Sequence, residues 1–261
     1  MRLLQYNIWD GCHDRQRYQK LHDFLVRESY DIVGFNELKF WTTEDLKQNM
    51  SDCGYPYTRF LGMESSAYSI GMASKYPIEI LMTKETEPFH HGMLHVKIKH
   101  LHFIITHLSP VSSERREREA IFIGDYVKKI PEPLILMGDL NTLSPLDKEN
   151  YEKIDLFAKL NATDHGRKCH LKDGGINYQP MQTLLDAGLH DVGEYKVLDI
   201  SMPTKVHENY KERRHVRIDY VLVNDPILNE NPKARVVRTK ELEQVSDHYP
   251  VECELDVEIE S

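Results

Sequence analysis

Short apolar runs recur along the whole chain and alternate with stretches whose apolar residues repeat at helical spacing. Each run suits a strand and is too short for a buried helix. A chain with such strands in both halves, many of them followed by a helix, needs a layered α/β architecture to bury both kinds of apolar surface. We expect strands at 2–8, 31–35, 68–74, 78–83, 94–98, 102–106, 134–137, 218–223 and 251–259.

Helical patterns lie between these runs, at about 15–29 with Asp14 as N-cap, near 43–52, and at 114–130. Several neighbouring strands have the short connections of antiparallel pairs, such as the hairpin expected across His100 and Leu101. This pattern favours two packed sheets with helices on both outer faces over one parallel sheet. Regular patterning weakens at 144–216, and 166–180 is expected to form a loop. No linker rich in Pro, Gly or Ser divides the chain, so we expect one domain over 1–261.

Polar residues stand where the apolar runs end or begin. Taken singly, a strand-terminal Asn shapes a turn and a lone acid is usually solvated. Asp219 differs, because an acid between Ile218 and Tyr220 is expected to be half buried and to need a partner. Strand ends present side chains to a shared face, so we expect these residues to form one site. The set consists of Asn7, Glu37, His107, Asp139, Asn141, Asp219, Asp247 and His248.

Oxygen ligands dominate this set, which holds three Asp, one Glu and two Asn beside two His. Carboxylate and amide oxygens favour Mg²⁺ or Mn²⁺, whereas zinc takes more His or Cys. The two His are then available for proton transfer and for contact with phosphate.

Six short motifs carry these residues in order along the chain. Together they resemble the ordered signature of the endonuclease/exonuclease/phosphatase superfamily, which includes deoxyribonuclease I, exonuclease III-type abasic endonucleases, tyrosyl-DNA phosphodiesterases, neutral sphingomyelinases and inositol polyphosphate 5-phosphatases. The resemblance runs from residue 2 to about 257. It implies a four-layer α/β/β/α sandwich of two mainly antiparallel sheets, with the site at one end. The motifs are Tyr-Asn-Ile (6–8), Asn-Glu (36–37), Thr-His-Leu (106–108), Gly-Asp-Leu-Asn (138–141), Arg-Ile-Asp-Tyr (217–220) and Ser-Asp-His (246–248).

The resemblance also implies a role for each matched residue. Glu37 is the principal ligand of Mg²⁺ or Mn²⁺, with Asn7 beside it and Asp247 assisting. Asp139, helped by Asn141, orients or deprotonates the attacking water. The remaining roles follow from the same comparison: His248 paired with Asp219 stabilises charge on the phosphate oxygens, and His107 hydrogen-bonds a non-bridging oxygen. Either Asp139 or His248 is the general base.

The first motif departs from the family pattern. Several members carry Asn-x-Asp there, with that Asp near the metal, whereas this chain has Trp9 at the corresponding position and Asp10 one residue later. Either Asp10 reaches the metal through a bulge, or Glu37 supplies most of the binding. The second interpretation is favoured.

Five residues outside the motifs are candidate substrate contacts. Trp9 and Trp41 lie beside motif residues, where an aromatic ring can stack on a base. The loop at 205–214 supplies Lys205, Arg213 and Arg214, which suit a basic rim for phosphates flanking the scissile one. Core packing is the competing interpretation for the tryptophans, and a solvated charged loop is the competing interpretation for the cations.

Two other groups of residues are interpreted as surface features. Arg115, Arg116 and Arg118 alternate with glutamates, which favours exposed i,i+4 pairs on a helix. His90, His91 and His95 are expected to be exposed, which disfavours a second metal site there.

Composition limits the possible partners and the compartment. A formal net charge of −9 argues against purely electrostatic binding of nucleic acid, although a local basic rim and metal ions suffice to hold a substrate. The four scattered cysteines suit free thiols in a reducing compartment. Since no apolar run reaches the length of a membrane span and no signal peptide is apparent, we expect a cytoplasmic protein that does not contact membranes. A monomer is expected.

Three functions are compatible with these observations. The favoured one is a metal-dependent phosphodiesterase acting on nucleic acid, either a nuclease or an enzyme that processes DNA ends. The alternative is a lipid or inositol-phosphate phosphoesterase of the sphingomyelinase or 5-phosphatase type, which the acidic charge supports. A non-catalytic binding protein on the same fold is disfavoured, because every motif residue is present.

Overall fold

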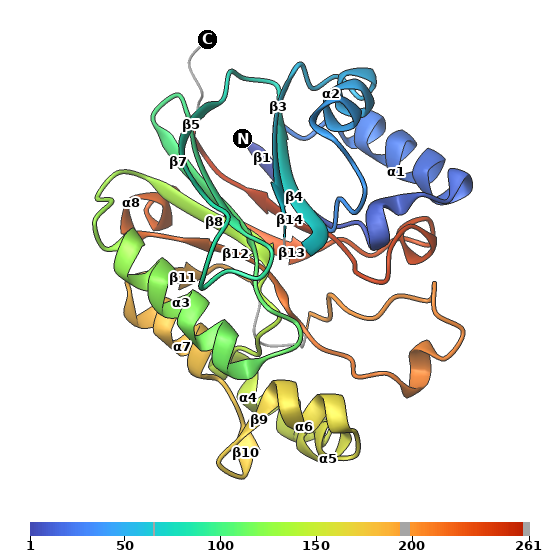
Figure 1. Cartoon of the computed structure of the whole chain (residues 1–261), viewed down its shortest axis with the longest axis vertical. Coiled ribbons are helices and arrows are strands. Elements are labelled where there is room, and N and C mark those ends of the chain that lie inside the picture. The colour runs from blue at the N-terminus through green and yellow to red at the C-terminus, as the bar shows by residue number, and fades with distance from the viewer. Residues whose placement is uncertain (65, 194–198, 258–261) are drawn as a thin grey trace.

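Two six-stranded sheets pack face to face at the centre of the molecule, and helices cover both outer faces (Figure 1). The computed structural model describes residues 1–64, 66–193 and 199–257. This arrangement is the predicted α/β/β/α sandwich, which is therefore confirmed.

The first sheet has the strand order β13-β14-β1-β2-β4-β3. Strands β1 and β2 run parallel, and every other neighbouring pair is antiparallel. The predictions omit β3 and β13, and they extend the last strand to Ile259, which lies outside the described residues. The strands are β1 (Arg2–Asn7), β2 (Ile32–Asn36), β3 (Tyr57–Met63), β4 (Ser66–Ser74), β13 (Lys233–Val236) and β14 (Val251–Glu254).

The second sheet has the order β11-β12-β8-β7-β6-β5. Here β7 and β8 run parallel while the other pairs are antiparallel, including the predicted hairpin of β6 and β7. The strands are β5 (Glu79–Lys84), β6 (Met93–Ile98), β7 (Leu101–His107), β8 (Leu134–Asp139), β11 (His190–Asp191) and β12 (Asp219–Val223).

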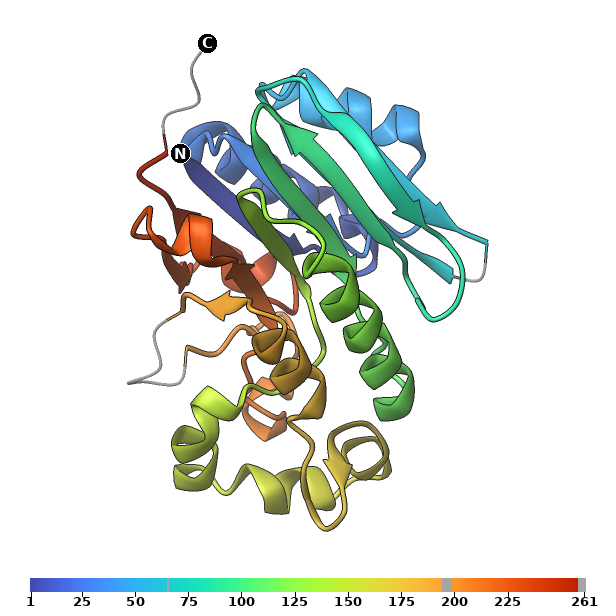
Figure 2. The ribbon, with the colours of Figure 1, turned by 90° about the vertical axis from the view of Figure 1, so that its left-hand side faces the viewer.

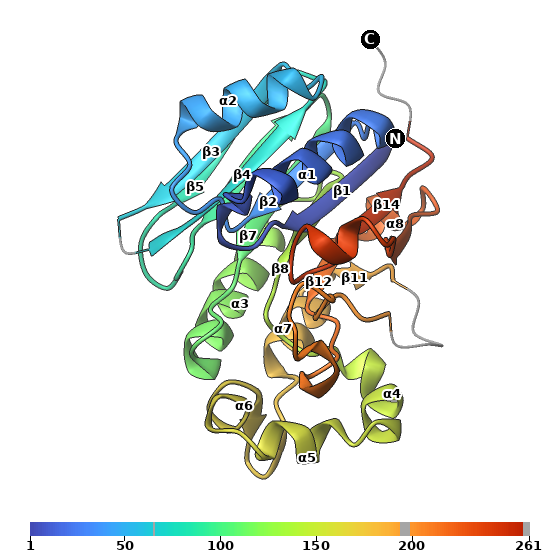
Figure 3. The ribbon, with the colours of Figure 1, turned by 90° about the vertical axis from the view of Figure 1, so that its right-hand side faces the viewer.

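Helices α1 (Arg15–Glu28) and α2 (Thr43–Asp52) cover the first sheet (Figure 3). The Asp14 carboxylate accepts the amides of Gln16 and Arg17 and so begins α1 as predicted. Helices α3 (Ser113–Val127) and α7 (Gln179–Asp186) cover the second sheet (Figure 2), and α8 (Asp225–Leu228) follows β12. Short 3₁₀ turns occur at Asp10–Cys12, Pro145–Asp147, Tyr210–Glu212 and Leu242–Gln244.

Alternate residues of the second sheet serve two different cores, because successive side chains of a strand point to opposite faces. Ile105 and Met137 belong to the core between the sheets. Their neighbours Ile104 and Leu136 pack under α3, together with Ile123. Both faces of β7 and β8 are therefore buried, which fits their near-continuous apolar sequences.

A helical insert over 144–178 lies beyond one end of the sandwich (Figures 1 and 3). The prediction of a loop at 166–180 is wrong, since this stretch contains the end of α6, a two-stranded hairpin and the start of α7. The short helices have no long apolar period; Tyr151, Leu156 and Leu160 instead form a small cluster with Val216 and Ile218. The elements of the insert are α4 (Lys148–Lys153), α5 (Leu156–Asn161), α6 (Asp164–His170), β9 (Leu171–Lys172) and β10 (Gly175–Ile176).

The four cysteines are free and buried. Throughout the described parts of the chain, every helix is too short or too polar to traverse a lipid bilayer.

Candidate active site

The predicted site residues converge because of how the strands are paired. Parallel pairing brings the ends of β1 and β2 together, and likewise the ends of β7 and β8. Strand β12 begins where its antiparallel partner β8 ends. Asp139 consequently stands in register with His107 on one side and Asp219 on the other. These strand ends meet at the end of the sandwich that faces the helical insert (Figure 1).

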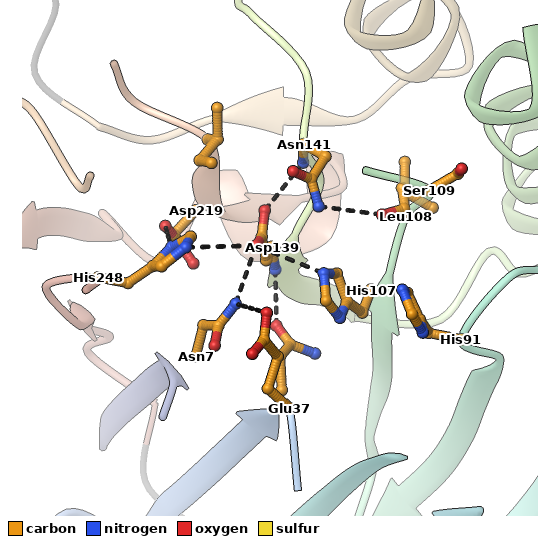
Figure 4. A network of polar contacts seen from close by, with 12 residues as sticks. Asn7, Glu37, His91, His107, Leu108, Ser109, Asp139, Asn141, Asp219 and His248 are labelled. Atoms are coloured by element: carbon orange, nitrogen blue, oxygen red, sulfur yellow. Dashed lines mark hydrogen bonds and ion pairs between the residues drawn. The ribbon is translucent and has the colours of Figure 1, made fainter. Parts of the chain in front are cut away.

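Asp139 lies at the centre of the polar network drawn in Figure 4. Its Oδ2 accepts a hydrogen bond from Asn7 Nδ2 at 3.0 Å and lies 3.5 Å from His107 Nε2 and 3.8 Å from His248 Nε2. Its Oδ1 accepts the amide of Asn141 at 2.9 Å. Burial, followed by the nearby Asp219, raises the pKa of the Asp139 carboxyl to about 8.

Gly138 allows β8 to approach β7 closely at this point. A Cβ atom there would lie 2.0 Å from the carbonyl oxygen of Thr106, so any larger residue would push the strands apart. The glycine of the fourth motif therefore has a steric role, beside the acid that it precedes.

Glu37 occupies the left-handed backbone region, with φ of 60°, which is costly for a residue that is not Gly, Asn or Asp. Its carboxylate accepts hydrogen bonds from Asn7 Nδ2 at 3.2 Å and from the Asp10 amide at 2.9 Å. Burial raises the pKa of the Glu37 carboxyl, and the negative charge of Asp247 acts in the same direction. The Asp10 side chain turns away and pairs with Lys39.

His248 and Asp219 form a buried pair, with Nδ1 of the ring 2.7 Å from Asp219 Oδ2. Burial alone would lower the pKa of His248, but Asp219, Asp247 and Asp139 together raise it well above its ordinary value. The ring is therefore an imidazolium at neutral pH, with Nδ1 held by Asp219 and Nε2 facing Asp139.

His107 is buried and neutral. Its ring stacks on His91 with 4.3 Å between centroids and 21° between planes (Figure 4). Burial lowers the pKa of His107 well below its ordinary value, and the neighbouring His91 and His248 lower it further. Burial also lowers the pKa of His91 to about 3, and Ser66 Oγ lies 2.7 Å from its Nδ1. The expectation that His91 and His95 are exposed is wrong, because each is only 2% exposed.

Asp247 connects the site to the loop after residue 204. Its Oδ2 lies 3.3 Å from His207 Nε2, and the His207 ring meets Trp9 edge-on with centroids 5.0 Å apart. Asp247 Oδ1 has no hydrogen-bond partner among the residues that the structure describes and lies 3.9 Å from His248 Nε2. An oxygen of this kind is available to a bound cation.

A cavity of about 620 Å³ opens above these side chains. Its floor consists of six of the eight motif residues, and its outer wall comes from α5, α6 and the segment at 209–216. The floor residues are Glu37, His107, Asp139, Asn141, Asp247 and His248, whereas Asn7 and Asp219 lie beneath them as hydrogen-bond partners.

The five predicted substrate contacts separate into two groups. Arg213 and Arg214 line the cavity. Trp9 packs between His207 and the guanidinium of Arg17, which lies 4.4 Å from its ring centroid. Like Trp9, the other two do not line the cavity: Trp41 is 8% exposed and donates its indole N–H to the Gly11 carbonyl at 2.8 Å, while Lys205 pairs with Glu243 at 2.7 Å.

Helix α3 also differs from its predicted surface role. Arg116 is only 2% exposed and donates to the carbonyl oxygens of Ser109, at 2.5 Å, and Cys169. Glu119 is fully buried and accepts the amides of Ser109 and His90 at 2.7 and 2.8 Å. The alternating charges are therefore divided between a solvent face and a buried face that supports the loop after His107.

The sequence interpretation misses three residues of the site and its wall. Asn36 donates to the Thr106 carbonyl at 3.0 Å and accepts the Asp139 amide at 2.7 Å, which ties the two sheets together. Its place directly before Glu37 in the second motif was the available signal. His165 and His170 line the outer wall. The signal in the sequence for the helix that carries them is its N-cap residue Thr163, whose hydroxyl accepts the Gly166 amide.

Two packed sheets between helices, with acids and histidines at one end, define the deoxyribonuclease I-like class of folds. The chain belongs to the Endonuclease/Exonuclease/phosphatase family, whose sequence model matches residues 4–248. No curated protein sequence gives a significant match.

Solved structures resemble this chain over nearly its whole length. An AP endonuclease from Archaeoglobus fulgidus superposes with a TM-score of 0.73 at 18% identity. A 3′-5′ exonuclease from Neisseria meningitidis gives 0.70 at 17% identity, and a 3′ phosphatase from Neisseria bound to a product DNA hairpin gives 0.72 at 18%. Each comparison covers 98% of this chain and 100% of the other. At these identities the likeness shows a shared fold.

Proposed function

We propose that this chain is a divalent-metal-dependent phosphoesterase that hydrolyses phosphate esters in nucleic acid with activated water. The observation that carries the proposal is the buried His248–Asp219 pair facing the Asp139 carboxyl across 3.8 Å, on the floor of a cavity. A charged imidazolium beside a carboxyl with a raised pKa supplies both an anion stabiliser and a proton acceptor. Nucleic acid as the substrate is supported by the DNA-directed activities named for the similar structures.

The floor suits a hard divalent cation. Glu37 and Asp247 offer carboxylate oxygens, and the Asp247 Oδ1 atom has no hydrogen-bond partner among the described residues. The pKa of Glu37 is raised because burial disfavours its negative charge, which a bound cation would neutralise. We assign the cation, Mg²⁺ or Mn²⁺, to Glu37 and Asp247, with Asn7 orienting the Glu37 carboxylate. When bound, it supplies Lewis-acid activation of the phosphate and offsets the repulsion between these acids.

A second group of potential ligands is Asp139, Asp219 and His248, whose donor atoms all lie within 4.8 Å of one another. Their chemistry argues for proton transfer instead. Asp219 Oδ2 and His248 Nδ1 are occupied by their mutual hydrogen bond, and a protonated imidazole has no lone pair to give a metal.

Each of the floor residues then has a separate role in the hydrolysis. Asp139, in the carboxylate form that prevails above its pKa of about 8, takes a proton from water, while the water oxygen forms a bond to phosphorus and the bond to the leaving oxygen breaks. The leaving oxygen keeps the bonding electrons and takes a proton from solvent. His248 stays protonated and donates from Nε2 to a phosphate oxygen as charge grows there. This assignment favours Asp139 over His248 as the general base, because the raised pKa of His248 keeps the ring charged. Asn141 fixes Asp139 through its amide, and neutral His107 supplies a further donor to the phosphate.

A second candidate is hydrolysis of a small phosphate ester, such as an inositol phosphate or a lipid headgroup. It is supported by the cavity of about 620 Å³, which has the size of sites that enclose small ligands.

The test is cleavage of labelled single- and double-stranded DNA and RNA by purified protein with Mg²⁺ or Mn²⁺, beside inositol phosphates and phospholipids. His248→Ala is the inactive comparison, and His100→Ala, at an exposed turn, is the matched control. Metal-dependent cleavage that only His248→Ala abolishes supports the proposal. Turnover that persists in excess EDTA, or that His248→Ala retains, contradicts it.

A further inference from the structure

The outer wall of the cavity carries positive charge opposite the acidic floor. Lys159 from α5 and Arg213 and Arg214 from the segment at 209–216 all line it. Among the described residues, a single acid, Glu212, lines this wall beside the three cations. In a chain with a formal charge of −9, this local excess of cations on one wall points to an anionic ligand.

Arg214 is the most informative of these side chains. Its Nη1 atom is buried and has no hydrogen-bond partner among the residues that the structure describes. Arg213, by contrast, donates from Nε to Asn209 Oδ1 at 3.2 Å. The residue as a whole is half-buried, but a guanidinium nitrogen that is buried without a partner is costly, because its donors lose water and gain no hydrogen bond in return. A ligand oxygen would supply the missing contact.

Two histidines line the same part of the cavity as this guanidinium and add neutral hydrogen-bonding groups. Burial lowers the pKa of His170 well below its ordinary value, and Arg116 and Arg214 lower it further. Burial and Arg214 also lower the pKa of His165. Both rings line the same wall and stay neutral, so each offers one N–H donor without adding charge.

An apolar strip connects the wall to the floor. The chain runs from Arg214 past Val216 and Ile218 to Asp219, and the two apolar side chains line the cavity together with Leu143 and Leu160. A ligand that reaches from the floor to the wall therefore passes over apolar side chains, which suit the body of a sugar ring.

We infer that the outer wall is a subsite for a second phosphate of the substrate, which is bound but not cleaved, with Arg214 as its principal contact. The inference rests on the proposed function and narrows the substrate to esters that carry another phosphate one sugar unit from the scissile one. That phosphate belongs either to the next linkage of a nucleic-acid end or to a small organic bisphosphate.

The kinetic test compares two pairs of substrates. The first pair is a trinucleotide and the same trinucleotide with its non-scissile linkage replaced by uncharged methylphosphonate. The second pair is a nucleoside 3′,5′-bisphosphate and the corresponding monophosphate. Wild-type kcat/KM should favour the more charged member of one pair, and Arg214→Ala should reduce that ratio by about tenfold, as loss of one charge-assisted contact does. The pair that responds identifies the source of the phosphate.

Arg167→Ala is the matched control, because Arg167 lies on α6, which forms part of the wall, but does not line the cavity and pairs with the exposed Asp164. It should keep the wild-type ratio. An Arg214→Ala variant that slows both members of each pair equally, or leaves both ratios unchanged, overturns the inference.

A second measurement is independent of turnover. In EDTA the acidic floor repels anions, so added pyrophosphate should bind at the outer wall. It should therefore raise the melting temperature of wild type and of Arg167→Ala, and not that of Arg214→Ala. Equal stabilisation of all three proteins, or of none, contradicts the subsite. Absence of any metal-dependent hydrolysis by wild type would instead contradict the proposed function, while this binding result would still decide the subsite.

Discussion

Asp219 lies in the second sheet and His248 in the segment that leads into the first, so the 2.7 Å contact between Nδ1 and Oδ2 joins the two halves of the sandwich at the site. Asp219 begins β12 of the second sheet, whereas His248 precedes β14 of the first. The bond from Asn7 to Asp139 crosses the same interface at 3.0 Å. The geometry of the site therefore depends on how the two sheets pack, which makes the core between them a part of the functional apparatus.

Asp219→Asn should lower kcat by about two to four orders of magnitude, because it removes the carboxylate that keeps His248 charged and oriented. Loss of that charge lowers the pKa of His248, so the decline of kcat at alkaline pH should begin at a lower pH than in wild type. The pH profile of kcat measures both effects. Asp225→Asn is the control, since it removes the acid of an exposed pair with His190. An unchanged profile for Asp219→Asn would refute the assignment.

Asp139→Asn should inactivate the protein and stabilise its metal-free form at neutral to alkaline pH. The pKa of about 8 in the folded protein lies above the unfolded value near 3.9. The stability that Asp139 contributes is therefore full below about pH 4 and is lost as the pH rises to about 8. Asparagine does not titrate, so the free energy of unfolding of the variant should exceed that of wild type increasingly across this window. Urea unfolding in EDTA at several pH values measures the difference, and a pH-independent difference would count against the raised pKa.

Much of the site was predictable from sequence, because its residues sit at the ends of strands whose apolar character is strong. The positions of Asp139 and His107 in the site followed from the two apolar runs that directly precede them in the sequence. The wall opposite was not predictable: α5 and α6 are short and pack on a local cluster around Leu160, so no long period marks them. The burial of Arg116 could not be predicted either, because alternating charges in a sequence do not distinguish a solvent-exposed helix face from one that lies beneath a loop.

Glu37→Gln should weaken binding of Mn²⁺ by at least about tenfold, because it removes a charged oxygen ligand from the floor. Asp10→Ala is an informative comparison. The Asp10 side chain pairs with Lys39 while its backbone amide serves Glu37, so this variant should bind Mn²⁺ as wild type does. Isothermal titration calorimetry measures both affinities. A larger loss in Asp10→Ala than in Glu37→Gln would assign the metal to Asp10 instead.

Asn36→Leu should destabilise the fold by about 2–4 kcal/mol, because it leaves several buried backbone and side-chain groups without partners. The Asn36 amide holds the Thr106 carbonyl, the Asp139 amide and, at 2.5 Å, the Gln5 side chain. Urea denaturation measures the loss. Asn229→Ala, at an exposed position, is the control and should stay within about 0.5 kcal/mol of wild type. An equally small effect of Asn36→Leu would show that the link between the sheets is dispensable.

His91 should act as a positioning residue that holds the His107 ring against the site. Its ring stacks on His107, and its pKa of about 3 keeps it neutral across the working pH range, so packing rather than charge is what it supplies. His91→Ala should lower kcat by about tenfold with little change in KM, because His107 loses the surface that fixes its Nε2 toward the phosphate. His91→Phe restores an aromatic face and should recover most of the lost kcat. If His91→Phe is as slow as His91→Ala, the imidazole itself is required, and the hydrogen bond with Ser66 rather than the stack is the contact that matters.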